Sequence, residues 1–318
     1  LSTPQPSPAE TRRMKLRDYL AIAILIVVAI AGRAMTSSDV GDGGSPRRPD
    51  PRQFKPSIQQ PPPYVSRSDP AKLLPNESAL DPRVIVEIKK KQGTSIGTAF
   101  SIDRSGIWIT AHHVTSECDL LGLQKSNGKL VRVRELTQRQ DADISILRTQ
   151  GGSPQMNVIR PRLRIGDDGY SFGFPQGSPG DVYGKVIGRG RMLTRGRYRK
   201  DEPVVAWTQI RRIPDAGADL SGISGGPWVD AAGDVIGVHV AGSPRRGRSY
   251  STAPRTLLTA IRQSDVRAGK DPRSNPPKET LTPRRFARYG EFLRRELTVI
   301  KVVCLVGEKW RRPARQSG

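Results

Sequence analysis

The chain contains 318 residues, which allows one large domain or two small ones at roughly 150 residues per domain. Hydrophobic residues make up 35% of it, beside 27 prolines and 32 glycines. This composition excludes a polytopic membrane protein, a coiled coil and a disulfide-dense mini-protein, and it predicts that part of the chain lies outside a packed core. The net charge is +23, of which +3 falls in residues 1–82, +12 in 83–264 and +8 in 265–318. Such an excess favours anionic partners, although a simple solubility charge explains it equally well.

The first region, residues 1–36, is predicted to be a cytoplasmic basic segment followed by a signal peptide or a membrane anchor. Four basic side chains precede an apolar run from Leu20 to Ala31, which is the layout of a secretory signal. The triplet Ala29–Ala31 offers a cleavage site. The longer run Tyr19–Met35 offers an uncleaved anchor, and Arg33 favours the anchor because it weakens the cleavage site. In both cases the charge bias predicts export of the remainder, either anchored and facing the periplasm or cell exterior, or secreted.

The next two regions differ sharply in pattern. Residues 37–82 contain ten prolines and no apolar periodicity, so they are predicted to form a disordered linker. Residues 83–264 contain many short apolar or alternating runs separated by turn residues, which predicts an all-β barrel or sandwich. Thr256–Gln263 has the pattern of one terminal helix.

Three segments of this β region carry the residue types of nucleophilic catalysis. Two histidines, His112 and His113, follow one apolar strand, Asp141-Ala142-Asp143 precedes another, and Ser224 lies in the run Gly-Ile-Ser-Gly-Gly-Pro. A serine hydroxyl needs a base within hydrogen-bond reach, and the base needs a carboxylate to orient it. Each segment alone is an ordinary turn or strand end. Their conjunction in the order His, Asp, Ser is that of the chymotrypsin-type triad.

With these motifs the chain resembles the trypsin-like (chymotrypsin-fold) serine peptidases. It is similar to the compact bacterial type, which includes the HtrA/Deg proteases and the glutamyl endopeptidases. The resemblance covers about residues 84–264 and implies two six-stranded antiparallel β-barrels with a short terminal helix and an active site between the barrels. Residues 265–318 are too few for the PDZ domain of HtrA proteases, and Ile223 replaces the aspartate that serves zymogen activation in digestive members.

The resemblance assigns the base and its carboxylate to His113 and Asp143. His113 directly precedes a valine, as the family's base does, which leaves His112 as the weaker candidate. Asp143 directly precedes the apolar strand, which leaves Asp141 as the weaker candidate for the carboxylate.

The nucleophile assigned by the resemblance is Ser224, since Ser221 lacks the two glycines that follow. These glycines allow a tight backbone turn. The amide groups of Gly222 and Ser224 are expected to form the oxyanion hole, where the loss of one donor costs about 100- to 1,000-fold in turnover.

The strand around His239 matches the one that lines the primary specificity pocket in this family, so substrate-binding residues are expected along it. A histidine at this position is similar to the glutamyl endopeptidases, where it helps bind an acidic P1 side chain. A cationic or donor imidazole, with nearby arginines, would act by charge-assisted hydrogen bonding. The alternative is a histidine satisfied within a pocket wall and a preference for small apolar P1 residues. The expected substrate-binding residues are His239, Val240, Ala241 and Gly242.

The tail, residues 265–318, is basic and less informative. Apolar residues spaced three and four apart between Phe286 and Leu297 fit an amphipathic helix. Such a helix is able to lie on an anionic membrane or to pack on the barrel, and disorder is the third alternative. The two cysteines, Cys118 and Cys304, make no disulfide framework, although an exported protein permits a bridge between them.

The sequence as a whole predicts an exported serine endopeptidase that cleaves peptide bonds through an acyl-enzyme and requires neither cofactor nor metal. Its expected partners are a protein or peptide substrate, the membrane if the N-terminal segment is uncleaved, and an anionic surface for the tail. One alternative is a weakly active or inactive binding or sensor module on the same fold, because a fold alone does not establish activity. The other is a basic surface-binding protein; no motif for specific nucleic-acid binding is present.

Overall fold

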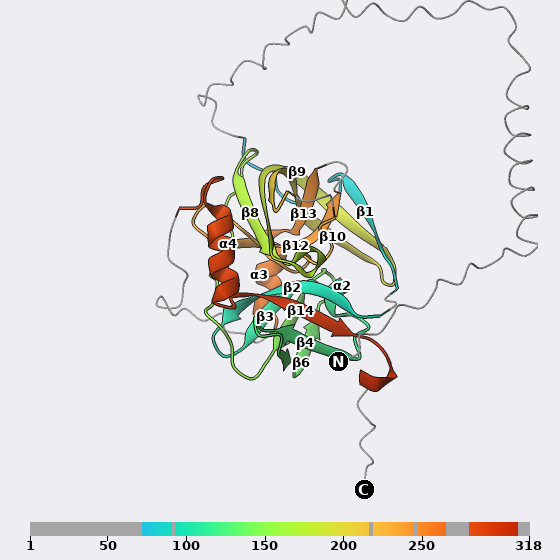
Figure 1. Ribbon diagram of the computed structural model, residues 1–318. Coiled ribbons are helices and arrows are strands. Elements are labelled where there is room, and N and C mark those ends of the chain that lie inside the picture. Colours follow the sequence, from blue (N-terminus) through green and yellow to red (C-terminus); the bar gives the residue numbers. More distant parts are fainter. Residues whose placement is uncertain (1–71, 91–92, 216–218, 244–246, 265–279, 311–318) are drawn as a thin grey trace, which may run out of the picture. The chain divides into compact units, whose positions relative to one another are not determined.

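The computed structural model describes residues 72–90, 93–215, 219–243, 247–264 and 280–310. These residues form two β-sheets flanked by short helices (Figure 1). The predicted signal peptide or anchor lies outside the described residues. Within the described ranges, no helix is long and apolar enough to cross a membrane.

One sheet closes into a six-stranded barrel. Strand β9 pairs with β8 on one side and with β10 on the other, which completes the ring β9-β10-β13-β12-β11-β8. Two indole rings, of Trp207 and Trp228, stack inside it with their centroids 4.3 Å apart. The barrel strands are β8 (Asp168–Gly173), β9 (Gly180–Gly196), β10 (Lys200–Ile213), β11 (Pro227–Val229), β12 (Val235–Ser243) and β13 (Arg248–Thr252), and β1 (Arg83–Ile88) adds to β9 in parallel.

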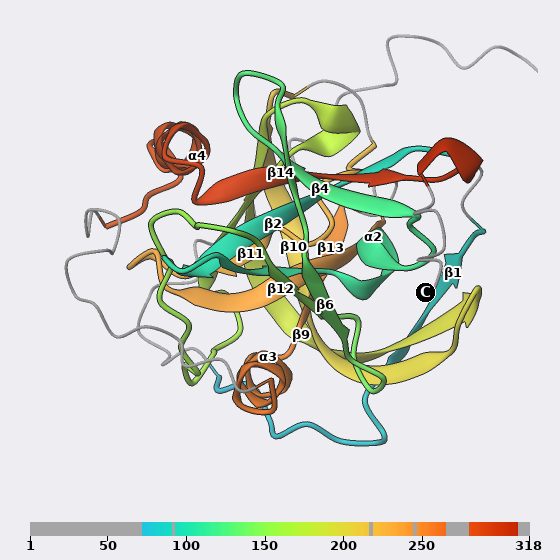
Figure 2. The same ribbon diagram turned by 90° about the horizontal axis from the view of Figure 1, so that it is seen from below.

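The other sheet has seven strands and stays open. Its order is β5-β4-β14-β2-β3-β7-β6, all antiparallel. Figure 2 shows β14 running beside β4 and β2. The strands are β2 (Ser95–Asp103), β3 (Ile107–Thr110), β4 (Leu120–Gln124), β5 (Leu130–Arg132), β6 (Glu135–Gln138), β7 (Ser145–Arg148) and β14 (Val299–Leu305).

Short helices connect and cover the sheets. The predicted terminal helix is confirmed as α3 (Pro254–Arg262). A second helix, α4 (Phe286–Arg295), buries Phe286, Tyr289 and Leu293, and its rings contact the aromatic side chains of β8. The remaining helical segments are α2 (His112–Thr115), η1 (Pro175–Gly177) and η3 (Glu308–Trp310).

The all-β, chymotrypsin-like fold predicted from the sequence is confirmed, and the two predicted barrels differ in closure. One unit is a closed six-stranded barrel and the other is a curled open sheet. The open sheet is completed by β14, which comes from the region predicted to be a separate tail and lies between β4 and β2. A disulfide between Cys118 and Cys304 joins β14 to the segment after α2, with a Cα–Cα distance of 5.3 Å. The boundary predicted at residue 264 is therefore too early for the folded unit.

The end of the predicted linker is also part of the fold. Leu74 is buried, and its amide donates to the carbonyl of Leu163 at 2.8 Å. The amide of Ile165 in turn donates to the carbonyl of Lys72 at 2.9 Å. A single buried leucine gives no periodic signal, so the sequence pattern of residues 37–82 did not predict that this segment packs against the loop before β8.

Candidate active site

His113 lies where β3 ends and the chain turns into the short helix α2. The four residues of β3 are buried, so the open sheet holds this corner in place. The imidazole Nδ1 of His113 lies 2.6 Å from Oδ2 of Asp143, and the His113 amide donates to Asp143 Oδ1 at 2.9 Å. The side chain of His113 remains 19% exposed, whereas that of Asp143 is fully buried. One edge of the imidazole is thus fixed by the carboxylate while part of the ring reaches the surface.

Asp143 is held as a carboxylate by its hydrogen bonds. Burial raises the pKa of Asp143, but the attraction of His113 and the hydrogen bonds from His113 and Tyr198 outweigh burial and keep the pKa below its usual value. The Tyr198 hydroxyl donates to Asp143 Oδ1 at 3.1 Å. The Asp143 amide donates to Oε1 of Glu202 at 2.7 Å. The carboxylate therefore has one fixed donor besides the histidine, the Tyr198 hydroxyl, while Glu202 holds the Asp143 backbone.

The two weaker candidates face elsewhere. His112 is buried, with Nδ1 2.7 Å from Nζ of Lys200 and 3.0 Å from the carbonyl of Arg139. Asp141 is exposed and forms an ion pair with Arg139 at 2.6 Å. The structure thus brings His113, and not His112, to Asp143.

The residues behind Asp143 come from the β9–β10 hairpin, with Arg197 and Tyr198 in its turn and Glu202 in β10, and sequence reasoning did not identify them. Arg197 donates to the carbonyl of His113 at 3.0 Å, and its own amide donates to the carbonyl of Ile88 in β1. Tyr198 and Glu202 lie 55 and 59 residues from Asp143 along the chain. A local sequence motif does not predict a contact between residues so far apart in the chain. The pairing of β9 with β10 brings these residues to Asp143.

The start of β10 supplies two buried ionisable groups, Lys200 and Glu202. Burial, followed by the nearby charge of Asp143, raises the pKa of Glu202 well above its usual value. Its Oε2 has no hydrogen-bond partner among the described residues, which fits a neutral carboxyl group. The Lys200 ammonium donates to the carbonyls of Arg139 and Ala142, and burial lowers its pKa.

The turn that contains Ser224 packs directly against the open sheet. The amide of Thr98 in β2 donates to the carbonyl of Ser224 at 2.8 Å, and the Thr98 hydroxyl donates to the carbonyl of Gly222 at 2.7 Å. A Cβ added to Gly225 would lie 2.2 Å from Oγ1 of Thr110, the last residue of β3. Since α2 starts two residues later, the Ser224 turn lies beside the corner that carries His113.

Positive φ angles shape this turn. Gly222 has φ +102° and Gly225 has φ +89°, a region that other residues adopt only with strain. Within the described part of the chain, no acceptor receives the amides of Gly222 and Ser224. Ser221, the weaker nucleophile candidate, is exposed and donates its hydroxyl to Asp219 at 2.6 Å.

The four expected substrate-binding residues lie at the end of β12 and differ in exposure. His239 and Val240 are buried, Ala241 is partly exposed and Gly242 is exposed. Nδ1 of His239 lies 3.2 Å from the hydroxyl of Ser171, and its ring stacks on Trp228. Burial, followed by the charge of His113, lowers the pKa of His239 to about 3. A pKa this low keeps the ring neutral at ordinary pH, which leaves the donor form of the imidazole, and not the cationic form, as the way in which His239 would bind an acidic P1 side chain.

Comparisons with known proteins show what this region of the chain is similar to. The model of the trypsin-like peptidase domain matches residues 97–238. Protease Do-like 5, chloroplastic, of Arabidopsis thaliana is 28% identical over 196 residues, which are 56% of this chain and 57% of that protein. A probable periplasmic serine endoprotease, DegP-like, of Brucella suis is 27% identical over 186 residues, 54% of this chain and 34% of that protein.

Solved structures of similar fold include the HtrA-type protease AlgW with decapeptide (22% identity, TM-score 0.43, 52% of this chain and 50% of that one) and the active form of the Rv3671c protease of M. tuberculosis (13% identity, TM-score 0.45, 64% and 97%). The chain spans about half or less of the length of the curated relatives named above. The family match supports the predicted class: residues 97–238 match the trypsin-like peptidase domain, and the chain is similar to serine proteases of the Do-like and DegP-like type.

Proposed function

We propose that the chain is a serine endopeptidase in which Ser224 is the nucleophile and His113 is its general base. The observation that carries this proposal is the contact of 2.6 Å between His113 Nδ1 and the buried carboxylate of Asp143. A carboxylate at Nδ1 fixes the tautomer whose Nε2 accepts a proton, and it stabilises the imidazolium that results. His113 then takes the proton of Ser224 as the hydroxyl oxygen attacks the peptide carbonyl. It returns that proton to the leaving amine, and water hydrolyses the acyl-enzyme.

The amides of Gly222 and Ser224 are proposed to stabilise the tetrahedral intermediate. Neither amide is engaged by an acceptor within the described ranges, so both remain available to an oxyanion. Fixed backbone donors need no rearrangement as charge develops on the substrate oxygen.

The substrate backbone is proposed to bind along the last residues of β12. Strand β11 pairs with β12 only from Val235 to Val238, whereas β13 covers the other edge as far as Ser243. An extended peptide could therefore add beside Ala241 and Gly242 by main-chain hydrogen bonds. Because His239 is buried and neutral, it offers no cationic imidazole to bind an acidic P1 side chain. The proposed substrates are therefore peptides without a preference for acidic P1 residues.

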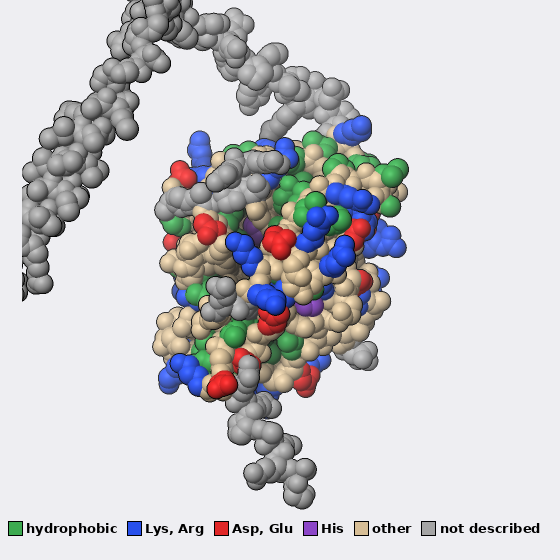
Figure 3. All heavy atoms as spheres, turned by 90° about the vertical axis from the view of Figure 1, so that its right-hand side faces the viewer, with side chains coloured by type: hydrophobic (Ala, Val, Ile, Leu, Met, Phe, Trp, Pro, Cys, Tyr) green, Lys and Arg blue, Asp and Glu red, His purple; other side chains and the backbone are tan. Residues whose placement is uncertain are grey.

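Export is proposed on three grounds. The predicted signal peptide or anchor precedes the domain, and the DegP-like relative of Brucella is described as periplasmic. The Cys118–Cys304 disulfide supports this location, since such bonds persist mainly in oxidising compartments. The anionic surface predicted for the basic tail remains a proposal. Acidic and basic side chains are interspersed over the face shown in Figure 3. The exposed arginines at and before α4 are the residues that would contact an anionic surface.

The nucleophile is tested with a fluorophosphonate probe on the full chain. We expect wild type and the matched control Ser221→Ala to be labelled, and Ser224→Ala to remain unlabelled. Circular dichroism confirms that each variant is folded. Labelling of folded Ser224→Ala would contradict the assignment of Ser224, and the absence of labelling in folded wild type would favour the binding-module alternative.

A further inference from the structure

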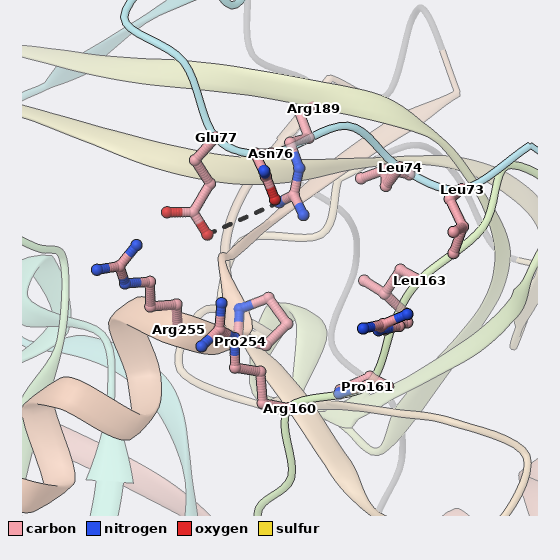
Figure 4. Close-up of a pocket in the computed structure, with 11 residues that line it drawn as sticks. Leu73, Leu74, Asn76, Glu77, Arg160, Pro161, Leu163, Arg189, Pro254 and Arg255 are labelled. Carbon is pink, nitrogen blue, oxygen red and sulfur yellow. Dashed lines mark ion pairs between the residues drawn. The ribbon is translucent and has the colours of Figure 1, made fainter.

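A cavity of about 740 Å³ lies on the barrel, formed by residues other than those of the candidate active site (Figure 4). Four stretches far apart in the sequence form it: the segment before β1, the loop before β8, strand β9 and the start of α3. Its volume is within the range of small-molecule sites, roughly 300–1,000 Å³. The lining residues that matter here are the four arginines Arg160, Arg162, Arg189 and Arg255, together with Glu77.

The wall of this cavity is fixed by backbone hydrogen bonds. The segment before β1 is tied to the loop before β8 by the amide of Leu74 and the carbonyl of Leu163, 2.8 Å apart. The guanidinium of Arg189 in β9 donates to the carbonyl of Pro75 in the same segment. The cavity therefore has a preformed frame, and leucine and proline residues line it beside the polar ones.

The charge in the cavity is one-sided. Four arginines face one acidic residue, Glu77, whose carboxylate lies 3.9 Å from Nη1 of Arg189. Figure 4 shows that Arg160, Arg189 and Arg255 come to the cavity lining from three different elements. Among the described residues, the guanidinium groups of Arg160, Arg162 and Arg255 form no hydrogen bond or ion pair, so three positive charges have no counterion from this part of the chain.

The start of α3 adds to the positive potential of the cavity. Pro254 and Arg255, the first two residues of α3, line the cavity. The amides of a first helical turn have no intrahelical acceptor, and the helix dipole favours an anion at that end. Guanidinium groups bind phosphate oxygens in paired, planar hydrogen bonds, which gives arginine clusters their preference for phosphate.

We propose that this cavity is a binding site for a phosphate-bearing anion, held by Arg160, Arg162 and Arg255, with Arg189 kept in place by Glu77 and the Pro75 carbonyl. The phosphate is that of a free polyphosphate or that of an anionic lipid headgroup. The site is separate from the His113–Asp143 pair, so the proposal does not depend on peptidase activity.

Isothermal titration calorimetry on the full chain tests the site with two probes. Inorganic tripolyphosphate represents the free source and glycerol 3-phosphate the headgroup source. We expect wild type to bind at least one probe, and the tighter probe identifies the source. The double variant Arg160→Ala/Arg255→Ala should weaken that binding at least tenfold, and raising the salt concentration should weaken the binding of wild type.

A charge-matched control separates the site from net charge. Arg104→Ala/Arg132→Ala removes two exposed arginines from the open sheet, outside the cavity, and should leave binding unchanged. The milder variant Arg160→Gln keeps a polar side chain at an exposed position and should be folded while still weakening binding. Equal loss in both double variants, or no binding of either probe by wild type, would overturn the proposal.

Discussion

The two halves of the candidate active site are built in different ways. The base half is made of polar side chains: the carboxylate of Asp143 receives hydrogen bonds from His113 and Tyr198, and Glu202 supports it from behind. The nucleophile half is made of backbone: glycines with positive φ shape the turn around Ser224, and the neighbouring strand holds that turn by main-chain hydrogen bonds. Charge and proton position should therefore decide the function of one half, and steric fit that of the other.

The largest expected effect is a steric one in the nucleophile half. In Gly225→Ala the new Cβ would lie 2.1 Å from the carbonyl oxygen of Thr98, which is backbone and cannot rotate away. The positive φ adds strain of roughly 1–2 kcal/mol. We expect a loss of at least about 3 kcal/mol in the free energy of unfolding and loss of probe labelling. Denaturant unfolding measures the first quantity.

Gly128→Ala is the matched control for this change. Gly128 also has positive φ, +79°, in the turn between β4 and β5, but no atom lies within 4 Å of its added Cβ. It should show the strain alone, roughly 1–2 kcal/mol, with labelling intact. Equal losses of unfolding free energy in both variants would mean that the backbone φ angle, and not the contact with Thr98, determines the destabilisation. Steric fit would then not distinguish the nucleophile half from the base half.

The next effect concerns the one buried titratable group of the nucleophile half. His239 connects β12 to the Ser224 turn, since its amide donates to the carbonyl of Gly226 and its carbonyl accepts from Gly225. Its pKa is about 3 in the folded protein, below the ordinary 6.5. As the pH falls below about 6, the unfolded chain therefore binds a proton that the folded chain refuses, and stability falls by about 1.4 kcal/mol per pH unit.

The variant His239→Gln should remove that part of the pH slope. We expect the free energies of unfolding of wild type and variant to converge by about 2–3 kcal/mol as the pH is lowered from about 6 to 4. Denaturant titrations across this range measure it. Parallel curves would show that the imidazole already takes up its proton in the fold, and a charged role in the specificity pocket would then return to consideration.

The sequence predicted the parts of this molecule that are local. Contiguous sequence patterns predict the strand ends and the helix α3. They also predict the segments around His113, Asp143 and Ser224. Strand β14 was missed because a polar break separates it from residues 83–264, and Leu74 was missed because one buried residue has no period. Tyr198 and Glu202 were missed because they reach Asp143 only through the long β9–β10 hairpin.

In the base half, Tyr198→Phe should reduce the rate of probe labelling about tenfold. The change removes one hydrogen bond to a charged carboxylate, worth about 1.5–3 kcal/mol, while the ring keeps its packing. Tyr183→Phe is the matched control, since it removes a tyrosine–aspartate hydrogen bond of 2.9 Å to Asp168, away from the site. It should leave the labelling rate unchanged. An equal reduction in both variants would assign the effect to general destabilisation instead of to Asp143.

The smallest expected effect is that of Glu202→Gln. Glutamine keeps the oxygen that accepts the Asp143 amide, and its new NH₂ group takes the place of Oε2, which has no partner among the described residues. If the folded carboxyl is neutral, stability at about pH 4.5 should change by less than about 1 kcal/mol. Above that pH the unfolded chain loses the Glu202 proton that the fold retains, so wild type should lose stability relative to the variant as the pH rises. A relative gain of wild type with pH would show an ionised Glu202 beside Asp143, and the base half would then hold two buried negative charges balanced by Lys200.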